Sequence, residues 1–186
     1  MRPKRLTRCS PPSIVRQMIK AGDKLPNATL RESTGYDDEL HCPTSPQPVD
    51  LESITKGKKV VLFGVPGAFT KTCSSKHLPG YLSAHDALKA SGVDAIICIS
   101  VNDGYVMSAW GRDHEVGDRI RMLGDGSGEL TKRLGLQADL TANGMGVRCR
   151  RFSMLVVDGV VKNVNVEEPG KFEVSDAQTM LRQLEG

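Results

Sequence analysis

The sequence lacks the features that would assign it to a membrane or extracellular class of protein. No apolar stretch among its 186 residues is long enough to span a bilayer, and no secretory hydrophobic region is recognisable. Its five cysteines follow no regular spacing of the kind that marks a disulfide framework. Internal repeats and low-complexity segments are absent too. Because 39% of the residues are hydrophobic, the chain can bury one substantial core, and we expect a soluble, single-domain protein of a reducing intracellular compartment.

Acidic residues are missing from the start of the chain, where the first is Asp23. Six basic residues precede it, so the formal net charge of +3 becomes about −3 once they are set aside, and it is no sign of nucleic-acid binding. They are Arg2, Lys4, Arg5, Arg8, Arg16 and Lys20. A basic, acid-free start is typical of an organelle presequence, although three prolines favour an untargeted extension. We expect residues 1–20 to be this extension and residues 21–186 the folded domain, in a mitochondrion or plastid if the extension is a presequence and otherwise in the cytoplasm.

One cysteine lies where a strand gives way to a helix. Residues 60–65 are uncharged and rich in β-branched side chains, which predicts a buried strand, and Pro66 and Gly67 end it. Beyond the turn a mostly apolar stripe recurs at three- and four-residue intervals and predicts a helix, at Leu78, Tyr81, Leu82, His85 and Leu88. Cys73 then lies in the first helical turn, where free backbone N–H groups and the helix dipole favour a thiolate. We expect a reactive sulfur.

Thr70 lies three residues before Cys73 and shares its face if the turn is already helical. Its hydroxyl can both donate and accept, which suits a peroxide in which one oxygen is held while the sulfur attacks the other. Simpler readings exist for each residue. Cys73 alone would be a small buried hydrophobe, Thr70 a helix cap and Pro66 a turn residue.

The string PGAFT at residues 66–70, a cysteine three residues later, and HLPGY at residues 77–81 resemble the type II peroxiredoxins, the peroxiredoxin 5-like branch. The likeness extends to residues 97–103, 109–111 and 150–159, and covers about residues 21–185. The resemblance implies a thiol-dependent peroxidase that reduces hydrogen peroxide and alkyl hydroperoxides through a cysteine sulfenic acid. It implies no metal and no organic cofactor.

Four site residues follow from the resemblance. Cys73 would attack the peroxide, Thr70 would hold it, Pro66 would cover the sulfur, and Arg151 would stabilise both the thiolate and the leaving oxygen. A solvated charge at a strand edge is the alternative for Arg151. Lys71 stands where many relatives have proline, and we expect its ammonium to stay in water.

The cysteine that would resolve the sulfenic acid is not evident from the sequence. Cys98 lies in the predicted buried strand 93–101, and Cys149 is predicted to share a strand face with Arg151. Val174 occupies the place where some relatives carry a resolving cysteine. We therefore expect an external thiol, either glutathione with glutaredoxin or a thioredoxin-like protein, with Cys98 and Cys149 as weaker candidates. The resemblance also implies a homodimer.

The order of the remaining patterns predicts a thioredoxin-like α/β fold, with a central mixed β-sheet flanked by helices and an N-terminal addition over residues 28–48. A single strand over residues 148–157, a turn at Asp158-Gly159 and a final helix capped by Ser175 are expected near the end. Two other classes stay open. A cysteine hydrolase would need a histidine base such as His77, and a peroxide sensor, redox relay or holdase would use the same scaffold without turnover.

Overall fold

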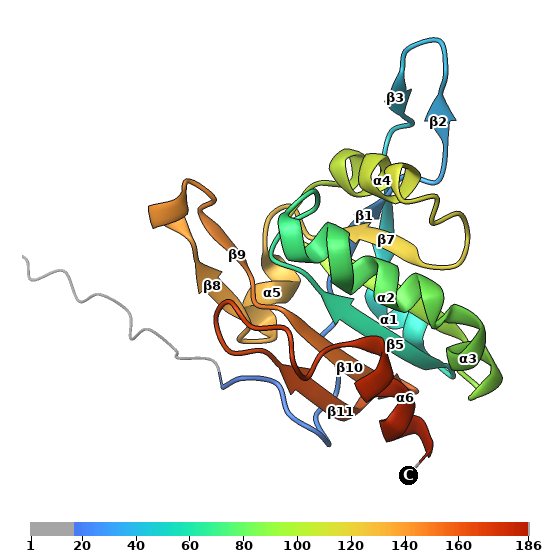
Figure 1. Ribbon diagram of the computed structural model, residues 1–186, viewed down its shortest axis with the longest axis vertical. Coiled ribbons are helices and arrows are strands. Elements are labelled where there is room, and N and C mark those ends of the chain that lie inside the picture. Colours follow the sequence, from blue (N-terminus) through green and yellow to red (C-terminus); the bar gives the residue numbers. More distant parts are fainter. Residues whose placement is uncertain (1–16, 186) are drawn as a thin grey trace, which may run out of the picture.

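The computed structural model describes residues 17–185 and contains one seven-stranded mixed sheet (Figure 1). Its strand order is β11-β10-β5-β6-β7-β1-β4. Neighbours β5, β6 and β7 run parallel, and the other neighbouring pairs run antiparallel. The strands are β1 (Thr29–Glu32), β4 (Gln47–Asp50), β5 (Lys59–Gly64), β6 (Ala95–Ser100), β7 (Arg121–Gly124), β10 (Phe152–Val157) and β11 (Val160–Val166). The predicted central mixed sheet is confirmed.

Helices cover both faces of this sheet because alternate residues of its strands are apolar on both sides. On β5, Val61 and Phe63 belong to one buried cluster, and Val60 and Leu62 belong to another. The first cluster packs against π-helical turn η1 (Cys73–His77) and helices α2 (Leu78–Ser83), α3 (His85–Ala90), α4 (Gly104–Asp113) and α6 (Ala177–Glu185). The second packs against α1 (Leu51–Thr55) and α5 (Glu129–Arg133). Within residues 17–185, no helix is long and apolar enough to cross a membrane.

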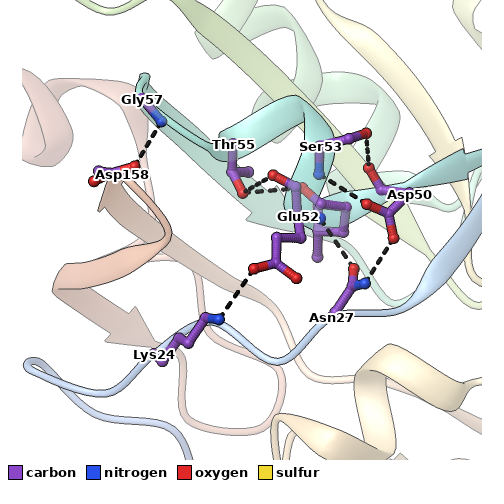
Figure 2. Close-up of polar contacts among 9 residues, drawn as sticks. Lys24, Asn27, Asp50, Glu52, Ser53, Thr55, Gly57 and Asp158 are labelled. Atoms are coloured by element: carbon purple, nitrogen blue, oxygen red, sulfur yellow. Dashed lines mark hydrogen bonds and ion pairs between the residues drawn. The ribbon is translucent and has the colours of Figure 1, made fainter.

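Side-chain hydrogen bonds hold α1 at its N-terminus and the segment that follows its C-terminus (Figure 2). The Asp50 carboxylate caps its N-terminus by accepting from the Ser53 amide at 2.9 Å, and Asn27 donates to the same carboxylate at 2.6 Å. Beyond the helix, Gly57 N donates to the Asp158 carboxylate at 2.6 Å. Asp158 belongs to the β10–β11 turn, so this bond ties the start of β5 to the closing hairpin.

The closing hairpin turns at Asp158 and Gly159, as predicted. Both residues have positive φ, 49° and 71°, which is the backbone that a two-residue hairpin turn requires. The single strand predicted over residues 148–157 is wrong. Residues Val147–Cys149 form β9, which pairs with β8 (Gln137–Asp139) in a separate ribbon, and β10 begins only at Phe152. The chain leaves one sheet and enters another at Arg150 and Arg151.

Two further differences concern the ends of the domain. The N-terminal addition contains β1 and β4, which extend the main sheet, and a hairpin of β2 (Tyr36–Asp37) and β3 (Cys42–Pro43) that projects beyond α4 (Figure 1). Asp176, rather than Ser175, caps the last helix, because its carboxylate accepts from the Thr179 amide at 3.0 Å. The Ser175 hydroxyl instead donates to Glu167 at 2.8 Å.

Strand β5 ends in a glycine because the neighbouring strand leaves no room for a side chain. Gly64 pairs with Phe152, and a Cβ at Gly64 would clash with the Phe152 ring. We expect Gly64→Ala to lower the free energy of unfolding by about 1–3 kcal/mol, the usual cost of overpacking a core. Gly80 lies in α2, where an added Cβ would have open space around it. Gly80→Ala should therefore raise the free energy of unfolding by about 0.5–1 kcal/mol. Urea unfolding of both variants checks the opposite signs, and two equal effects would contradict the packing account.

Candidate functional site

Cys73 lies at the start of the helical segment that follows β5, with no exposed surface. Residues 71 and 72 are already helical, and Cys73–His77 then form a π-helical turn in which the Leu78 amide donates to the Cys73 carbonyl. The sequence predicts an α-helical first turn at Cys73, and the structure has the wider π-helical turn there instead. Pro79 lies in the first positions of α2, directly after this π-helical turn, where a proline, which has no N–H, is tolerated.

The pairing of β5 with β10 brings Arg151 to Cys73 across 78 residues of sequence. These strands are antiparallel, and Gly64 at the end of β5 lies opposite Phe152 at the start of β10. The residue before β10 therefore reaches the loop after β5. Arg151 Nη2 donates to Cys73 Sγ at 3.4 Å, and Arg151 Nη1 lies 3.0 Å from His77 Nδ1. This arrangement places a fixed positive charge against the sulfur.

The other two arginines of this basic segment hold backbone instead. Arg148 donates to the carbonyl of Met145 at 2.8 Å, and Arg150 Nη2 donates to the carbonyl of Glu167 at 2.8 Å. Lys71 is exposed to solvent, as expected. Of the basic side chains considered in the sequence, Arg151 is the one that the described structure places on Cys73.

The loop between β5 and Cys73 carries Pro66 and Thr70, both half-buried. The Thr70 hydroxyl donates to the Gly67 carbonyl at 2.9 Å, so its lone pairs stay open to accept a proton donor. Thr70 lies one turn before Cys73, where its carbonyl accepts from the Ser74 amide at 2.9 Å. Phe69 takes a left-handed backbone, with φ of 59°. A bulky residue in that region is strained, which is common in loops that carry a functional site.

Asn102 holds this loop in place and was not identified as a site residue from the sequence. Its side-chain oxygen accepts from Ala68 N at 3.0 Å and from the Ser100 hydroxyl at 2.7 Å. Trp110 similarly donates to the Ser74 hydroxyl at 2.9 Å and braces the residue after Cys73. The only sequence signal for either residue is its place in the segments that resemble the family.

His77 is buried beneath the guanidinium, and the sequence left open whether it is a base. Burial, together with the charge of Arg151, lowers its pKa from 6.5 to about 3. Its Nε2 lies 3.1 Å from the Ser175 carbonyl, which can only accept, and its Nδ1 faces an arginine, which can only donate. The imidazole is therefore neutral and both nitrogens are engaged. This state does not suit the base of a cysteine hydrolase.

The other cysteines differ in which face of the sheet they occupy. Cys98 belongs to the buried cluster that contains Cys73, and burial raises its pKa well above the usual value. Cys149 belongs to the opposite cluster, and burial raises its pKa to about 12. The prediction that Cys149 shares a face with Arg151 is wrong, because the strand breaks between them. None of Cys42, Cys73, Cys98 and Cys149 is in a disulfide, and Cys9 lies outside the described residues.

Two cavities found among residues 17–185 lie away from Cys73. The larger, of about 910 Å³, lies between α4, β7 and the segment after β1, and is lined by Glu32, Arg112 and Arg121 among others. Between residues 17 and 185, no group of three or more His, Cys, Asp or Glu side chains is placed to hold a metal ion. The chemistry available at the site is that of a sulfur, a guanidinium, a hydroxyl and backbone dipoles.

The lowered pKa of His77 makes the stability of the fold depend on pH. Below pH 6.5 the unfolded chain protonates His77, whereas the folded protein, with Arg151, Glu167 and Asp176 around the ring, does so only near a pKa of about 3. Its contribution is full above pH 6.5 and is lost as the pH falls, by about 1.4 kcal/mol per pH unit. Between about pH 7 and pH 5 we expect the free energy of unfolding to fall by about 2 kcal/mol more than in His77→Asn. Urea unfolding followed by Trp110 fluorescence measures this difference, and parallel pH profiles would contradict it.

Residues 20–181 match the Redoxin family model. Peroxiredoxin-2E, chloroplastic, of Arabidopsis thaliana is 47% identical over 171 residues, which cover 89% of this chain and 69% of that protein. Peroxiredoxin-2F, mitochondrial, of Arabidopsis thaliana is 43% identical over 160 residues, covering 86% of this chain and 79% of that protein. The crystal structure of reduced Prx3 in complex with H2O2 from Vibrio vulnificus has a TM-score of 0.80 at 47% identity, and the match covers 90% of this chain and 99% of that one.

The matches span the sheet, the loop after β5 and the helices on both faces, and the relatives include chloroplastic and mitochondrial proteins. Peroxiredoxins are peroxidases that act on peroxides with thiol reductants. The resemblance noted in the sequence and the thioredoxin-like fold are thus confirmed. The chain belongs to the Redoxin family and is a type II peroxiredoxin, a thiol-dependent peroxidase.

Proposed function

We propose that Cys73 is the peroxidatic residue of this enzyme. The observation that carries the assignment is the 3.4 Å contact between Arg151 Nη2 and Cys73 Sγ. In the reaction the thiolate attacks the terminal oxygen of a hydroperoxide, an S–O bond forms and the O–O bond breaks. Cys73 is oxidised to a sulfenic acid, and the peroxide is reduced to an alkoxide or hydroxide that takes up a proton from solvent.

Three neighbours assist this step. Arg151 stabilises the thiolate and the negative charge that grows on the leaving oxygen, as a fixed cation in a water-poor site does best. The Thr70 hydroxyl accepts a hydrogen bond from the hydroxyl of the bound hydroperoxide, because its own proton is already directed at the Gly67 carbonyl. Pro66 covers the sulfur, in keeping with the absence of exposed surface at Cys73.

Cys73 is regenerated by an external thiol, either glutathione with glutaredoxin or a thioredoxin-like protein. The thiol attacks the sulfenic sulfur, a mixed disulfide forms and water leaves; a second thiol then releases Cys73. Burial supports this route over an internal one. Cys98 is held protonated in the core by its raised pKa, and Cys149 lies across the sheet.

The protein acts as a homodimer. Three apolar side chains border the active-site loop and are exposed: Phe69 by 56%, Tyr105 by 47% and Val147 by 49%. Asn102 joins the loop to the segment before Tyr105, and Arg148 in β9 donates to the Val101 carbonyl, so the three belong to neighbouring segments. Exposed apolar surface of this kind is typical of a protein contact.

Residues 1–20 act as an organelle-targeting extension. Their basic, acid-free composition and the occurrence of chloroplastic and mitochondrial relatives support this assignment. Residues 1–16 lie outside the described residues. The last part of the extension packs on the domain, because Ile19 is buried in the core and its amide donates to the Leu134 carbonyl at 2.9 Å. The domain proper takes up the remainder of the chain, residues 21–186.

Mass spectrometry after one equivalent of hydrogen peroxide tests these assignments. We expect the native protein to gain one oxygen atom on the Cys73 peptide, and to carry glutathione there when that thiol is present. Cys73→Ser should gain neither and should consume no peroxide, whereas Cys42→Ser, in the projecting hairpin, should behave as native.

The identity of the peroxidatic residue and the external-thiol route can each be contradicted by its own outcome. Peroxide consumption by Cys73→Ser would overturn the identity of the peroxidatic residue. A stable internal disulfide to Cys98 or Cys149 would overturn only the external-thiol route.

A further inference from the structure

A buried carboxylate lies behind the loop that follows β11. Glu167 is only 3% exposed, and its Oε1 accepts from the amides of Glu173, Val174 and Ser175, each at 2.8 Å. The Ser175 hydroxyl donates to the same oxygen at 2.8 Å. Successive amides that converge on one oxygen form an anion nest. Burial works against ionisation, but these hydrogen bonds outweigh it and lower the pKa of Glu167, so the group is an anion that fixes the loop.

The loop that Glu167 fixes presents one carbonyl to the helix that bears Cys73. The Ser175 carbonyl accepts from the Tyr81 hydroxyl at 3.0 Å and faces His77 Nε2 at 3.1 Å. Nε2 must then carry the proton of the neutral ring, which leaves a lone pair on Nδ1. Arg151 Nη1 donates to that lone pair at 3.0 Å while Nη2 points at Cys73.

Glu167 also holds Arg151 from its backbone side. The Glu167 amide donates to the Arg151 carbonyl at 2.9 Å, and Arg150 Nη2 donates to the Glu167 carbonyl at 2.8 Å. The hydrogen bonds therefore form a closed ring from the Arg151 carbonyl through Glu167, Ser175 and His77 to the Arg151 guanidinium. Phe172 of the same loop lies with its ring 5.6 Å from that guanidinium.

We propose that Glu167 and His77 are positioning residues of the peroxidase site, which hold the Arg151 guanidinium on Cys73 through this ring of hydrogen bonds. The proposal rests on the role given to Arg151 above. A free arginine side chain samples many rotamers in water, and each one away from the sulfur leaves the leaving oxygen without its donor. The ring removes that freedom before the peroxide arrives, which is the preorganisation that makes a donor effective in catalysis.

The test compares two reactions of the same sulfur. Reduction of hydrogen peroxide develops negative charge on an oxygen that Arg151 must hold. Alkylation by iodoacetamide forms an S–C bond and breaks the C–I bond, so the charge leaves on iodide, which is a weak hydrogen-bond acceptor and needs no donor. We expect Glu167→Gln to lower the second-order rate with hydrogen peroxide at least about tenfold, less than the 10²–10³ for complete loss of a donor. Alkylation at a pH where Cys73 is ionised should change little. The adjacent Glu168 is exposed, and Glu168→Gln is the matched control with native rates.

A pair of His77 variants separates the two bonds of the ring. Asn carries an oxygen near the place of Nδ1 and can still accept from Arg151, whereas Gln reaches the place of Nε2 and can only replace the bond to Ser175. We expect His77→Asn, which keeps an acceptor for Arg151 but loses the tie to Ser175, to lower the ratio of peroxide rate to alkylation rate about tenfold, as Glu167→Gln does. His77→Gln leaves Arg151 without that acceptor and should lower the ratio further. A merely structural role of His77 predicts the same ratio in both variants.

A double-mutant cycle decides whether these residues act through Arg151. In an Arg151→Lys background there is no fork to orient, so Glu167→Gln should cause no further loss in the ratio. Additive losses, or a native ratio in Glu167→Gln, would overturn the proposal while leaving the peroxidase assignment intact. If Glu167→Gln does not fold, the His77 pair decides alone. Failure of the peroxidase assignment itself would appear only as activity in Cys73→Ser.

Discussion

The contact between the Arg151 guanidinium and the Cys73 sulfur is the interaction on which the rest of the structure depends. Cys73 has no exposed surface, and a thiolate without water is costly unless a partner compensates for the lost hydration. Arg151 is that partner, and it reaches the sulfur with one nitrogen while a second nitrogen is engaged by His77. The peroxidatic role that we propose for Cys73 therefore rests on a positive charge that two hydrogen bonds hold against the buried sulfur.

The fold delivers this contact through strand order rather than through sequence proximity. The end of β5 and the start of β10 lie side by side because the two strands are antiparallel neighbours in the sheet. The loop after β5 then meets the segment before β10. Asn102, from the segment after β6, holds the loop from the next strand over. The ends of three neighbouring strands, β5, β6 and β10, therefore set the positions of Cys73 and Arg151 relative to each other.

Much of this architecture could be read from the sequence because it rests on local patterns. The apolar run 60–65, the Asp158-Gly159 turn and the helix after Cys73 each carry a short-range signal, and the structure contains all three. The break between β9 and β10 carried no such signal. A run of β-prone residues looks the same whether it stays in one sheet or crosses to another, so the face occupied by Cys149 was misjudged.

The supporting residues were harder to find for a related reason. Glu167 lies in a polar stretch of sequence that resembles an exposed loop. Only the structure shows that its carboxylate is buried and accepts hydrogen bonds from three amides and a hydroxyl of the loop before α6. His77 could be placed on the face of Cys73 from its spacing, but its neutral state follows from burial and from Arg151, which are tertiary facts. Hydrogen-bond partners far apart in sequence cannot be paired from one chain alone.

The second-order rate of Cys73 oxidation by hydrogen peroxide, measured in a single turnover, tests the central contact most directly. Trp110 donates to Ser74, the residue after Cys73, so its fluorescence can follow the reaction. In Arg151→Gln we predict a rate about 10²–10³ lower than in the native protein, and in Arg182→Gln, an exposed arginine of α6, a native rate. Equal rates in all three proteins would contradict the account.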